Sequence, residues 1–581
     1  MPEPAKPPMN DSPLRRTEGG GRAALRSIGG FLLAVGIVIG AAVPRLADRG
    51  NRPMHCDEAV HGIKFGKLLE DDDYVYDPHE YHGPSLNFLT LPIARIASTS
   101  KRTEVTESEL RLLPAIFGIA LVGSLWLVRD ELGRGATRWA ALLTAVSPAM
   151  VYYSRYYIQE MLLVGFTLGA IVALCRWHRE VVAGRGAERG PTGASRLRTV
   201  WWLVVLGLAV GMMHATKETC AIAIVSMVVA GAFGLAGVWR IGAKRLLGAA
   251  LVVLPVAAGI SALFFSSFFD NPRSVLDSYT TYFHYLGRAS GDGSVGRHVY
   301  PPDYYFRILF WWRRGDGPVW SEASIALLAL VGLAAVVRRK VEPSTLPALR
   351  FVAIYTLLMT AVYAALPYKT PWCALGFFHG MILLAGVGAA ALVRFMPGGA
   401  LKALATVALL GAAGHLSWQA WRASFVDYAD AGNPYVYSHT TTDVFEVVER
   451  VEQMAACHPD GRAMHVQVIC PDHDYWPLPW YLRGFGRVGW YDRPPAGPPA
   501  PLIVTQPDSE PALLDYLYVK QPPGQRHLYV PVAPDAGGDW LLRPHVPLRV
   551  YVRLDVFEDL PAPKGLPGDG DATSESVRQW P

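Results

Sequence analysis

Residues 351–393 read FVAIYTLLMTAVYAALPYKTPWCALGFFHGMILLAGVGAAALV, two apolar runs joined by the polar connection LPYKTPWC. Lys369 is the only Asp, Glu, Lys or Arg in the stretch. A helix needs about 20 mainly apolar residues to cross a hydrocarbon core of about 30 Å. The stretch therefore predicts two membrane-spanning helices that turn back on each other near Lys369.

The same pattern recurs along most of the chain. Of its 581 residues, 51% are hydrophobic and 18% charged, and the mean hydropathy is +0.21, too apolar for a soluble enzyme of this length. Spans are expected near residues 28–48, 111–128, 136–153, 158–177, 200–215, 219–238, 246–266, 320–337, 351–367, 373–393 and 401–420. We predict an α-helical polytopic membrane protein with about eleven transmembrane helices.

Basic residues mark every second connection between these spans. They gather at 15–26, 129–138, 179–198, 240–245, 338–340 and 394–402. Placing the N-terminus inside brings all of these clusters to the cytoplasmic side, as the positive-inside rule requires. We expect a multi-pass protein of the cytoplasmic (inner) membrane, with its active site and C-terminal domain on the extracytoplasmic side.

Composition divides the chain into three parts. Residues 1–27 are charged and rich in Pro and Gly, which predicts a disordered cytoplasmic N-terminus. Residues 28–424 form the membrane domain, with outer loops at 49–110 and 267–319. Residues 425–581 alternate helix-like DVFEVVERVEQMAA with strand-like MHVQVIC, PLIVTQ and LRVYVRLDVF. They predict a small extracytoplasmic α/β domain with a disordered end.

Charge and cysteine content argue against two classes of function. The net charge is +5 and the arginines lie in short clusters, so no nucleic-acid surface is expected. The six cysteines form no C-x-x-C pair, which argues against a thiol-bound metal. Cys457 and Cys470 share one expected outer segment, so a disulfide between them is one alternative and free thiols the other.

The first outer loop contains MHCDEAVHGIKFGKLLEDDDYVYDPHEYHGPSLNFLTLP, residues 54–92. If 57–69 is helical, His61 lies one turn beyond Asp57 and Glu58. A partly desolvated carboxylate there can act as a general base, so Asp57 and Glu58 are the candidate catalytic residues. The acidic run 70–73 is interpreted as a solvated loop.

Histidines surround these carboxylates. His55, Asp57 and His61 offer metal ligands, but their spacing matches no specific metal motif. We therefore expect no metal, with a divalent cation as the alternative cofactor. Further on, His79, Glu80 and His82 are candidate substrate-binding residues, as are His55 and His61. Gly83 and Pro84 follow and should turn the chain into a second short helix.

Three short connections fall on the same outer side as this loop. SPAMVYYSRYYIQEMLL carries Tyr153, Arg155 and Glu160; HATKET carries Lys217 and Glu218; LPYKTPWC carries Lys369. Each charge alone is explained by snorkelling to the headgroups, and the tyrosines by an aromatic belt. Their convergence beside an acidic loop instead favours a substrate-binding site, since cations there would neutralise a leaving phosphate.

Taken together, these motifs resemble the GT-C glycosyltransferase superfamily, within it the dolichyl-phosphate-mannose-protein mannosyltransferase-like branch, and there a prokaryotic family labelled flippase-activity-associated. The resemblance rests on HCDEAVHG, DPHEYHGPSLNFLTLP, SRYYIQE, ATKET, LPYKTPWC and YWPLPWYLRG, from about residue 54 to 485. It implies sugar transfer from a polyprenyl-phosphate donor on the outer face, usually with inversion. It places the acidic motif at Asp57 and Glu58, and the partner motif at Arg155 and Glu160.

The mechanism expected from this resemblance has three parts. Asp57 or Glu58 deprotonates an acceptor hydroxyl, while Arg155, Lys217 and Lys369 stabilise the departing lipid phosphate. Tyr152, Tyr153, Tyr156 and the loop histidines shape the sugar pocket. The expected partners are the polyprenyl-phosphate sugar donor, a glycan, lipid or protein acceptor, and membrane lipids.

Two other functions compete with the enzyme. A lipid-linked sugar flippase or transporter should carry polar residues at mid-span and broken helices. The spans expected here are nearly free of mid-membrane charge, which favours the enzyme. A non-catalytic, flippase-associated membrane protein would make the charged loop dispensable.

Overall fold

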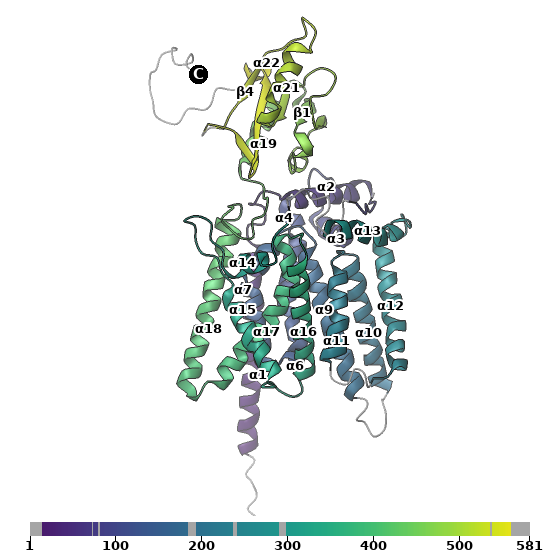
Figure 1. Cartoon of the computed structure of the whole chain (residues 1–581), viewed down its shortest axis with the longest axis vertical. Coiled ribbons are helices and arrows are strands. Elements are labelled where there is room, and N and C mark those ends of the chain that lie inside the picture. The colour runs from purple at the N-terminus through teal and green to yellow at the C-terminus, as the bar shows by residue number, and fades with distance from the viewer. Residues whose placement is uncertain are drawn as a thin grey trace, which may run out of the picture. The chain divides into compact units, whose positions relative to one another are not determined.

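The computed structural model describes residues 14–72, 74–79, 82–183, 193–235, 241–289, 298–534 and 537–558. The chain falls into two compact units. The first comprises Met1–Arg52 and Val60–Tyr437 and is a helix bundle (Figure 1). The second comprises Pro53–Ala59 and Ser438–Pro581 and contains a β-sheet. Residues 425–437, expected in the C-terminal domain, lie in the first unit.

The first unit is built from long helices joined by shorter ones. The long helices are α1 (Leu14–Leu46), α5 (Leu112–Ser124), α7 (Arg134–Val146), α9 (Glu160–Ala183), α10 (Gly193–His214), α11 (Cys220–Gly234), α12 (Ala243–Phe265), α15 (Ala323–Val337), α16 (Leu346–Ala365), α17 (Leu375–Phe395) and α18 (Gly398–Trp421). The connecting helices are α2 (Cys56–Asp71), α3 (Ser85–Ala97), α4 (Glu107–Leu110), α6 (Arg129–Leu132), α8 (Pro148–Tyr153), α13 (Ser274–Ala289) and α14 (Tyr304–Phe310).

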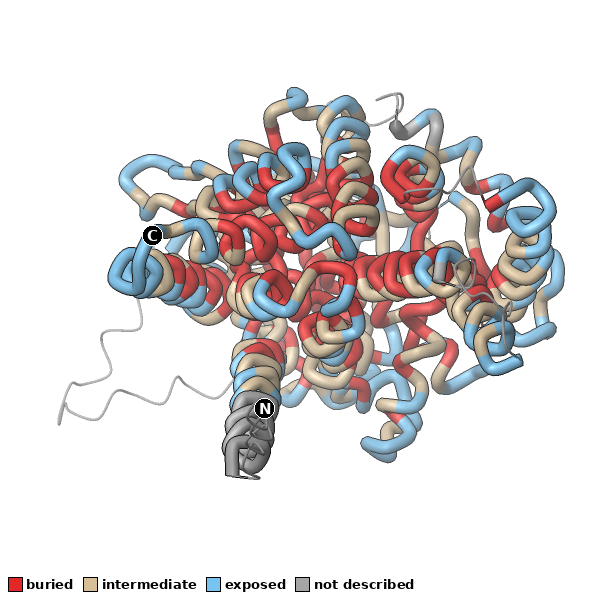
Figure 2. Tube along the Cα trace, turned by 90° about the horizontal axis from the view of Figure 1, so that it is seen from below, coloured by how far each residue is buried: buried red, intermediate tan, exposed pale blue. Residues whose placement is uncertain are grey.

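Eight helical segments among the described residues are long and apolar enough to cross a membrane. They are Ile28–Leu46, Glu107–Leu132, Glu160–Val182, Gly193–His214, Ala243–Phe265, Leu346–Ala365, Pro371–Phe395 and Gly398–Val426. The shorter apolar helices α11 and α15 occupy the spans expected at 219–238 and 320–337. The multi-pass helical membrane architecture is thereby confirmed. Buried residues gather inside the bundle, and exposed residues surround it (Figure 2).

The single span expected over 136–153 is wrong. The structure divides it into α7, which ends at Val146, and α8, which begins at Pro148. The hydroxyl of Ser147 accepts the Met150 backbone N–H and so caps α8. Proline fits the first position of a helix because it lacks an N–H and has a fixed φ. The sequence Ser-Pro therefore starts a new helix here.

Close helix contacts in the bundle depend on small residues. A Cβ at Gly332 of α15 would collide with the carbonyl of Leu384 in α17, and one at Gly388 of α17 with the carbonyl of Leu328. Small residues let membrane helices approach to backbone contact, where van der Waals packing replaces the hydrophobic effect. The two glycines thus fix the crossing of α15 and α17.

A buried arginine joins the C-terminal end of α1 to the end of α7. Arg45 is fully buried and donates to the carbonyls of Ala41, Thr144 and Ala145, each at 3.0 Å. Its Nε donates to the Ser154 hydroxyl at 3.2 Å. The carbonyls of Thr144 and Ala145 lie at the end of α7, where the last C=O groups have no partner within the helix. Arg45 therefore supplies hydrogen-bond donors to the carbonyls left without partners where the chain breaks between α7 and α8.

The second short helix expected after Gly83 and Pro84 is confirmed as α3, and its start docks on the connection 215–219. The Ser85 backbone N–H donates to the Ala215 carbonyl at 2.9 Å, and the hydroxyls of Ser85 and Thr216 lie 2.8 Å apart. A Cβ at Gly83 would overlap the Ala215 carbonyl. Glycine is required here because two backbones touch.

The second unit is an α/β domain, as expected. Its helices are α19 (Asp443–Cys457), α20 (Leu478–Tyr481), α21 (Glu510–Leu514) and α22 (Leu554–Glu558), and its strands β1 (Val466–Ile469), β2 (Val488–Tyr491), β3 (Leu502–Thr505), β4 (Tyr529–Val532), β5 (Trp540–Arg543) and β6 (Val546–Arg553). The strand order is β2-β1-β3-β6-β4, with β5 paired to β6. β1 runs parallel to β2 and β3, and β6 antiparallel to its partners.

The core of this domain explains the alternation seen in the sequence. Val466 and Val468 of β1 pack with α19 on one face of the sheet, and Ile469 and Ile503 pack with α21 and the residues after it on the other. Cys457 and Cys470 are both free thiols, so the disulfide alternative is wrong. Cys470 instead contributes to the buried core.

Substituting Gly83 tests the docking of α3. Gly83→Ala should lower the free energy of unfolding by about 1–3 kcal/mol, because the added methyl overpacks a backbone contact. Thermal unfolding in detergent measures the change, with Gly259→Ala as control, since no atom lies within 4 Å of a Cβ built at Gly259. Equal unfolding temperatures for the two variants would contradict the close approach.

Candidate active site

The two acidic candidates occupy different environments at the start of α2. Glu58 is fully buried, and its carboxylate accepts the backbone N–H of His55 at 3.0 Å. The first N–H groups of a helix have no partner within it. Glu58 is the third residue of α2, a position from which a carboxylate can reach back to the N–H of the residue before the helix. The side chain of Asp57 is 50% exposed. Glu58 therefore stabilises the helix start, and Asp57 is the accessible carboxylate.

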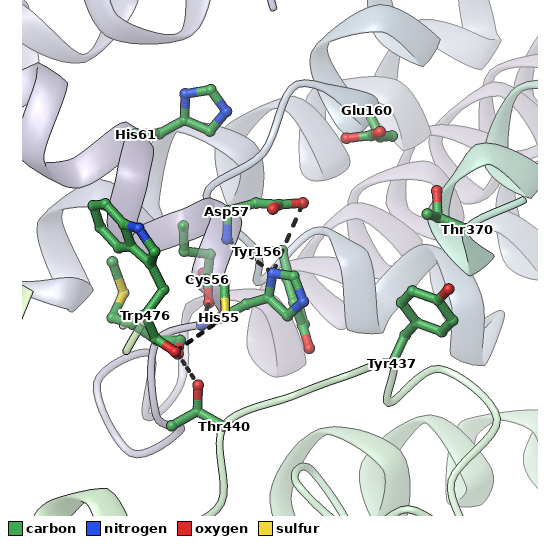
Figure 3. A network of polar contacts seen from close by, with 12 residues as sticks. His55, Cys56, Asp57, His61, Tyr156, Glu160, Thr370, Tyr437, Thr440 and Trp476 are labelled. Atoms are coloured by element: carbon green, nitrogen blue, oxygen red, sulfur yellow. Dashed lines mark hydrogen bonds and ion pairs between the residues drawn. The ribbon is translucent and has the colours of Figure 1, made fainter. Parts of the chain in front are cut away.

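His55 flanks Asp57 without neutralising it. Nδ1 of His55 accepts the backbone N–H of Asp57 at 3.1 Å and lies 3.8 Å from its carboxylate (Figure 3). Since this nitrogen accepts a hydrogen bond, it carries no proton to share with the carboxylate. The other face of the His55 ring stacks on His439, with the centroids 5.8 Å apart.

Residues of the YWPLPWYLRG motif hold this segment. The Met54 backbone N–H donates to the Tyr481 hydroxyl at 2.8 Å, and the Cys56 thiol donates to the Trp476 carbonyl at 3.4 Å (Figure 3). The Thr440 hydroxyl donates to the Met54 carbonyl at 2.7 Å. The motif in the tail thus fixes the chain that enters α2.

A second group of polar side chains lies within the first unit, and we call it the polar cluster. It consists of His61, His82, Gln159, Glu160, Lys217 and Glu218. His61 receives an amide contact from Gln159 at 3.0 Å and stacks with His82 at 6.4 Å. Lys217 and Glu160 form an ion pair, each with a side chain 6% exposed. The loop after α2, the start of α9 and the connection 215–219 therefore meet here.

The remaining members of the polar cluster are also paired. Nδ1 of His82 lies 2.8 Å from a Glu218 carboxylate oxygen and 3.1 Å from the Tyr285 hydroxyl. An ionised carboxylate only accepts hydrogen bonds, so Nδ1 of His82 is the donor to Glu218.

Burial decides which of these groups are charged. Burial holds the pKa of His61 well below its usual range, and Lys64 and Lys217 lower it further, so this ring is neutral at pH 7. For Lys217, burial opposes the charged form, but the carboxylate of Glu160 outweighs it and raises the pKa. The cluster therefore holds a buried ion pair beside a neutral histidine.

Arg155 lies at the end of α1, where its guanidinium donates to three backbone carbonyls. The acceptors are Pro44 at 2.7 Å, Ala47 at 2.5 Å and Asp48 at 2.9 Å. Burial, with Arg52 and Arg111 nearby, lowers the pKa of Arg155 to about 9. In this conformation the side chain acts as a C-terminal cap of α1.

Lys369 is engaged in a similar way. Its ammonium donates to the carbonyls of Ala364, at 3.1 Å, and Leu366 at the end of α16. Burial lowers the pKa of Lys369. Arg155 and Lys369 thus both place positive charge at helix C-termini, where it is stabilised by the helix dipole.

The tyrosines of SRYYIQE and its flank are buried in the core. Tyr153 is 1% exposed, and its hydroxyl donates to the Tyr435 carbonyl at 2.9 Å. The Tyr152 hydroxyl donates to the Tyr428 carbonyl and lies 2.9 Å from that of Tyr156. Their role in a sugar pocket stays a prediction.

Two candidates of the later loop remain. His79 is exposed, and its ring lies 4.1 Å from that of His284. Glu80 lies outside the described residues. Within the described ranges, no group of three or more His, Cys, Asp or Glu side chains is arranged to hold a metal ion. The metal alternative at His55, Asp57 and His61 gains no support.

Several buried charges were not predicted from the sequence, among them Arg52 and Glu322. Arg52 places its guanidinium 3.6 Å from the ring of Tyr156 and donates to the Arg155 carbonyl at 2.6 Å. Glu322 accepts from the Ser147 hydroxyl at 2.5 Å and the Tyr435 hydroxyl at 2.7 Å. The position of Glu322 could have indicated its role. It directly precedes the apolar run of α15, and a charge at the edge of a membrane span needs a partner.

The family model of dolichyl-phosphate-mannose-protein mannosyltransferase matches residues 86–263, from α3 to α12. No curated protein matches the chain in sequence.

Solved structures share the fold over most of the chain. The archaeal oligosaccharyltransferase AglB from Archaeoglobus fulgidus, in complex with an inhibitory peptide and a dolichol-phosphate, has a TM-score of 0.55 at 13% identity over 84% of this chain and 70% of that one. In another structure of that enzyme, tethered with an acceptor peptide, the chain covers 64%, under two thirds of its length. ArnT from Cupriavidus metallidurans, bound to undecaprenyl phosphate, has a TM-score of 0.56 at 15% identity over 90% and 98%.

These comparisons confirm the resemblance expected from the loop motifs. The matched family region begins at Leu86, directly after the HGPS docking segment, and includes Glu160 and Lys217. The fold match extends over the bundle and beyond it. Over residues 86–263 the chain is similar to dolichyl-phosphate-mannose-protein mannosyltransferase, and it shares its fold with the AglB and ArnT structures.

Proposed function

We propose that this chain is a membrane glycosyltransferase that moves a sugar from a polyprenyl-phosphate donor to an acceptor on the outer face of the cytoplasmic membrane. The proposal rests on the different environments of the two adjacent carboxylates at the start of α2. Asp57 is half-exposed and Glu58 is buried in the helix start. One turn after Asp57, the same helix contributes His61 to the polar cluster.

In the proposed reaction Asp57 is the general base. Its carboxylate takes the proton of an acceptor hydroxyl, and the oxygen attacks the anomeric carbon from the side opposite the lipid phosphate. The bond between the anomeric carbon and the phosphate oxygen breaks, and the phosphate leaves with the electron pair. One displacement inverts the anomeric configuration.

Positive charge stabilises the departing phosphate in this scheme. Lys217 belongs to the polar cluster and contributes to the field around His61, on the helix that carries the base. Arg155 and Lys369 have their donors on backbone carbonyls. We therefore assign direct phosphate contact to Lys217 and longer-range electrostatic support to the other two. His61 is proposed to bind the sugar phosphate through its ring N–H group. His82 donates its Nδ1 N–H to Glu218, so its Nε2 is proposed to accept a hydroxyl of the sugar.

The donor class rests on the similar structures. One is bound to undecaprenyl phosphate and another holds a dolichol-phosphate. A donor whose tail stays in the bilayer presents its phosphate at headgroup level, where we place the polar cluster. The acceptor is proposed to be a glycan, lipid or protein reached from the extracytoplasmic side, on which we also place the C-terminal domain.

Sugar transfer by purified protein in nanodiscs, from a panel of polyprenyl-phosphate sugars, tests this function. Asp57→Asn should lower turnover by about 100-fold to 10,000-fold, the usual contribution of a general base. Asp71→Asn is the matched control because Asp71 is an exposed acid of the same helix, and it should keep full turnover. Full turnover in Asp57→Asn would refute the base assignment; sugar translocation without transfer would favour the flippase.

Breaking the buried ion pair separates its structural role from a catalytic one. Glu160→Gln should destabilise the protein by about 3–5 kcal/mol, because it leaves Lys217 buried without its counter-charge. Glu160→Leu/Lys217→Met should recover most of that stability in thermal unfolding, since an apolar pair of similar volume replaces both charges. The double variant should lack transfer activity although it is stable, because it has lost the ammonium of Lys217 that is proposed to contact the phosphate. Normal turnover in it would exclude Lys217 from the phosphate site.

A further inference from the structure

The region 267–319, expected to be an outer loop, contains the amphipathic helix α13. Its outward face carries Leu276, Tyr279 and Phe283, which are 69%, 53% and 76% exposed. Their spacing of three and four residues places them on one stripe of the helix. An exposed stripe of two aromatic rings and a leucine is costly in water, since burying each such side chain gains about 1.5–3 kcal/mol.

The opposite face of α13 covers the loop that leads into the polar cluster. The Thr281 hydroxyl donates to the Pro78 carbonyl at 2.8 Å, and the ring of His284 lies against His79. The Tyr285 hydroxyl lies 3.1 Å from Nδ1 of His82. One helix therefore touches the polar cluster on one side and leaves an apolar stripe on the other.

The apolar stripe follows closely in sequence after a helix that can span a membrane. Leu247, Leu251 and Leu254 of α12 are 62%, 67% and 64% exposed and follow a helical spacing. After α12 ends at Phe265, the exposed rings of Phe268 and Phe269 lead toward α13. Figure 1 shows α13 lying across the end of α12 rather than continuing along it. Because α12 is long and apolar enough to span a membrane, we expect its exposed leucines to face lipid, and Phe268 and Phe269 lie between the end of this helix and α13.

We propose that α13 is an interfacial helix whose 276/279/283 stripe binds the outer leaflet of the bilayer. Amphipathic helices of this kind lie in the interface plane with the apolar face sunk to the level where headgroups meet acyl chains, and aromatic rings favour that depth. The partner is the lipid surface itself. Its polar face then forms the wall between the lipid and His79 and His82.

This placement also assigns α13 a role in donor access, which rests on the proposed function. A polyprenyl phosphate in the outer leaflet carries its phosphate at the depth of α13. We place its path to His82 beside Tyr285, whose hydroxyl lies 3.1 Å from Nδ1 of His82. Anchoring of α13 in lipid therefore positions the wall along which the lipid donor enters.

Nitroxide labels in nanodiscs test the lipid contact directly. Labels would be placed at Leu276→Cys, Tyr279→Cys or Phe283→Cys, in a full-length background with Cys56, Cys373 and Cys457 replaced by Ser. Power-saturation EPR compares collision with oxygen, which concentrates in lipid, and with a water-soluble nickel complex. Val519→Cys is the matched control, since Val519 is apolar and 67% exposed in the second unit.

We expect oxygen collision to exceed nickel collision at all three α13 positions, and the reverse at Val519. Nickel collision at α13 equal to that at Val519 would overturn the proposal, and so would low collision with both reagents, which indicates a protein partner.

A second measurement keeps this inference apart from the proposed function. Phe283→Glu should raise KM for a membrane-embedded donor by about tenfold with kcat little changed, because ground-state capture is weakened rather than chemistry. Lipid contact by EPR in a protein without transfer activity would refute the proposed function and leave the interfacial helix standing. An unchanged KM would refute the access role.

Discussion

The buried ion pair of Lys217 and Glu160 is the constraint around which the connections at this end of the bundle are arranged. Two charges removed from water are tolerated only when they satisfy each other. The pair binds the start of α9 to the connection between α10 and α11. That same connection receives the start of α3 at Gly83 and Ser85. Three motifs distant in sequence are thereby held together, with His61 and His82 among them.

A second constraint separates two adjacent carboxylates. The carboxylate of Glu58 accepts a backbone N–H at the start of α2, whereas the side chain of Asp57 is half-exposed. Neighbouring residues on a helix point about 100° apart, so one can serve the fold while the other serves chemistry. Arg155 and Lys369 also have structural roles, because they donate to backbone carbonyls at the ends of α1 and α16.

Sequence predicted the elements whose signal is local. Apolar runs located the membrane helices, alternation located β1, β3 and β6, and Gly83-Pro84 predicted α3. The break at Pro148 was missed because both halves are apolar, and α13 was missed because its stripe is short and split by polar residues. Adjacent in sequence, Asp57 and Glu58 could not be told apart without the His55 N–H that only Glu58 accepts. Likewise, the carbonyl partners of Arg155 come from residues about 110 positions away.

The central claim is that a lipid phosphate binds at the polar cluster, and its position can be observed. A cryo-EM map of the protein in nanodiscs with undecaprenyl phosphate would show where the phosphate lies. We expect phosphate density within hydrogen-bonding distance of Lys217 or His61. Phosphate density bound elsewhere on the protein, with the polar cluster unchanged and occupied only by its own side chains, would contradict it.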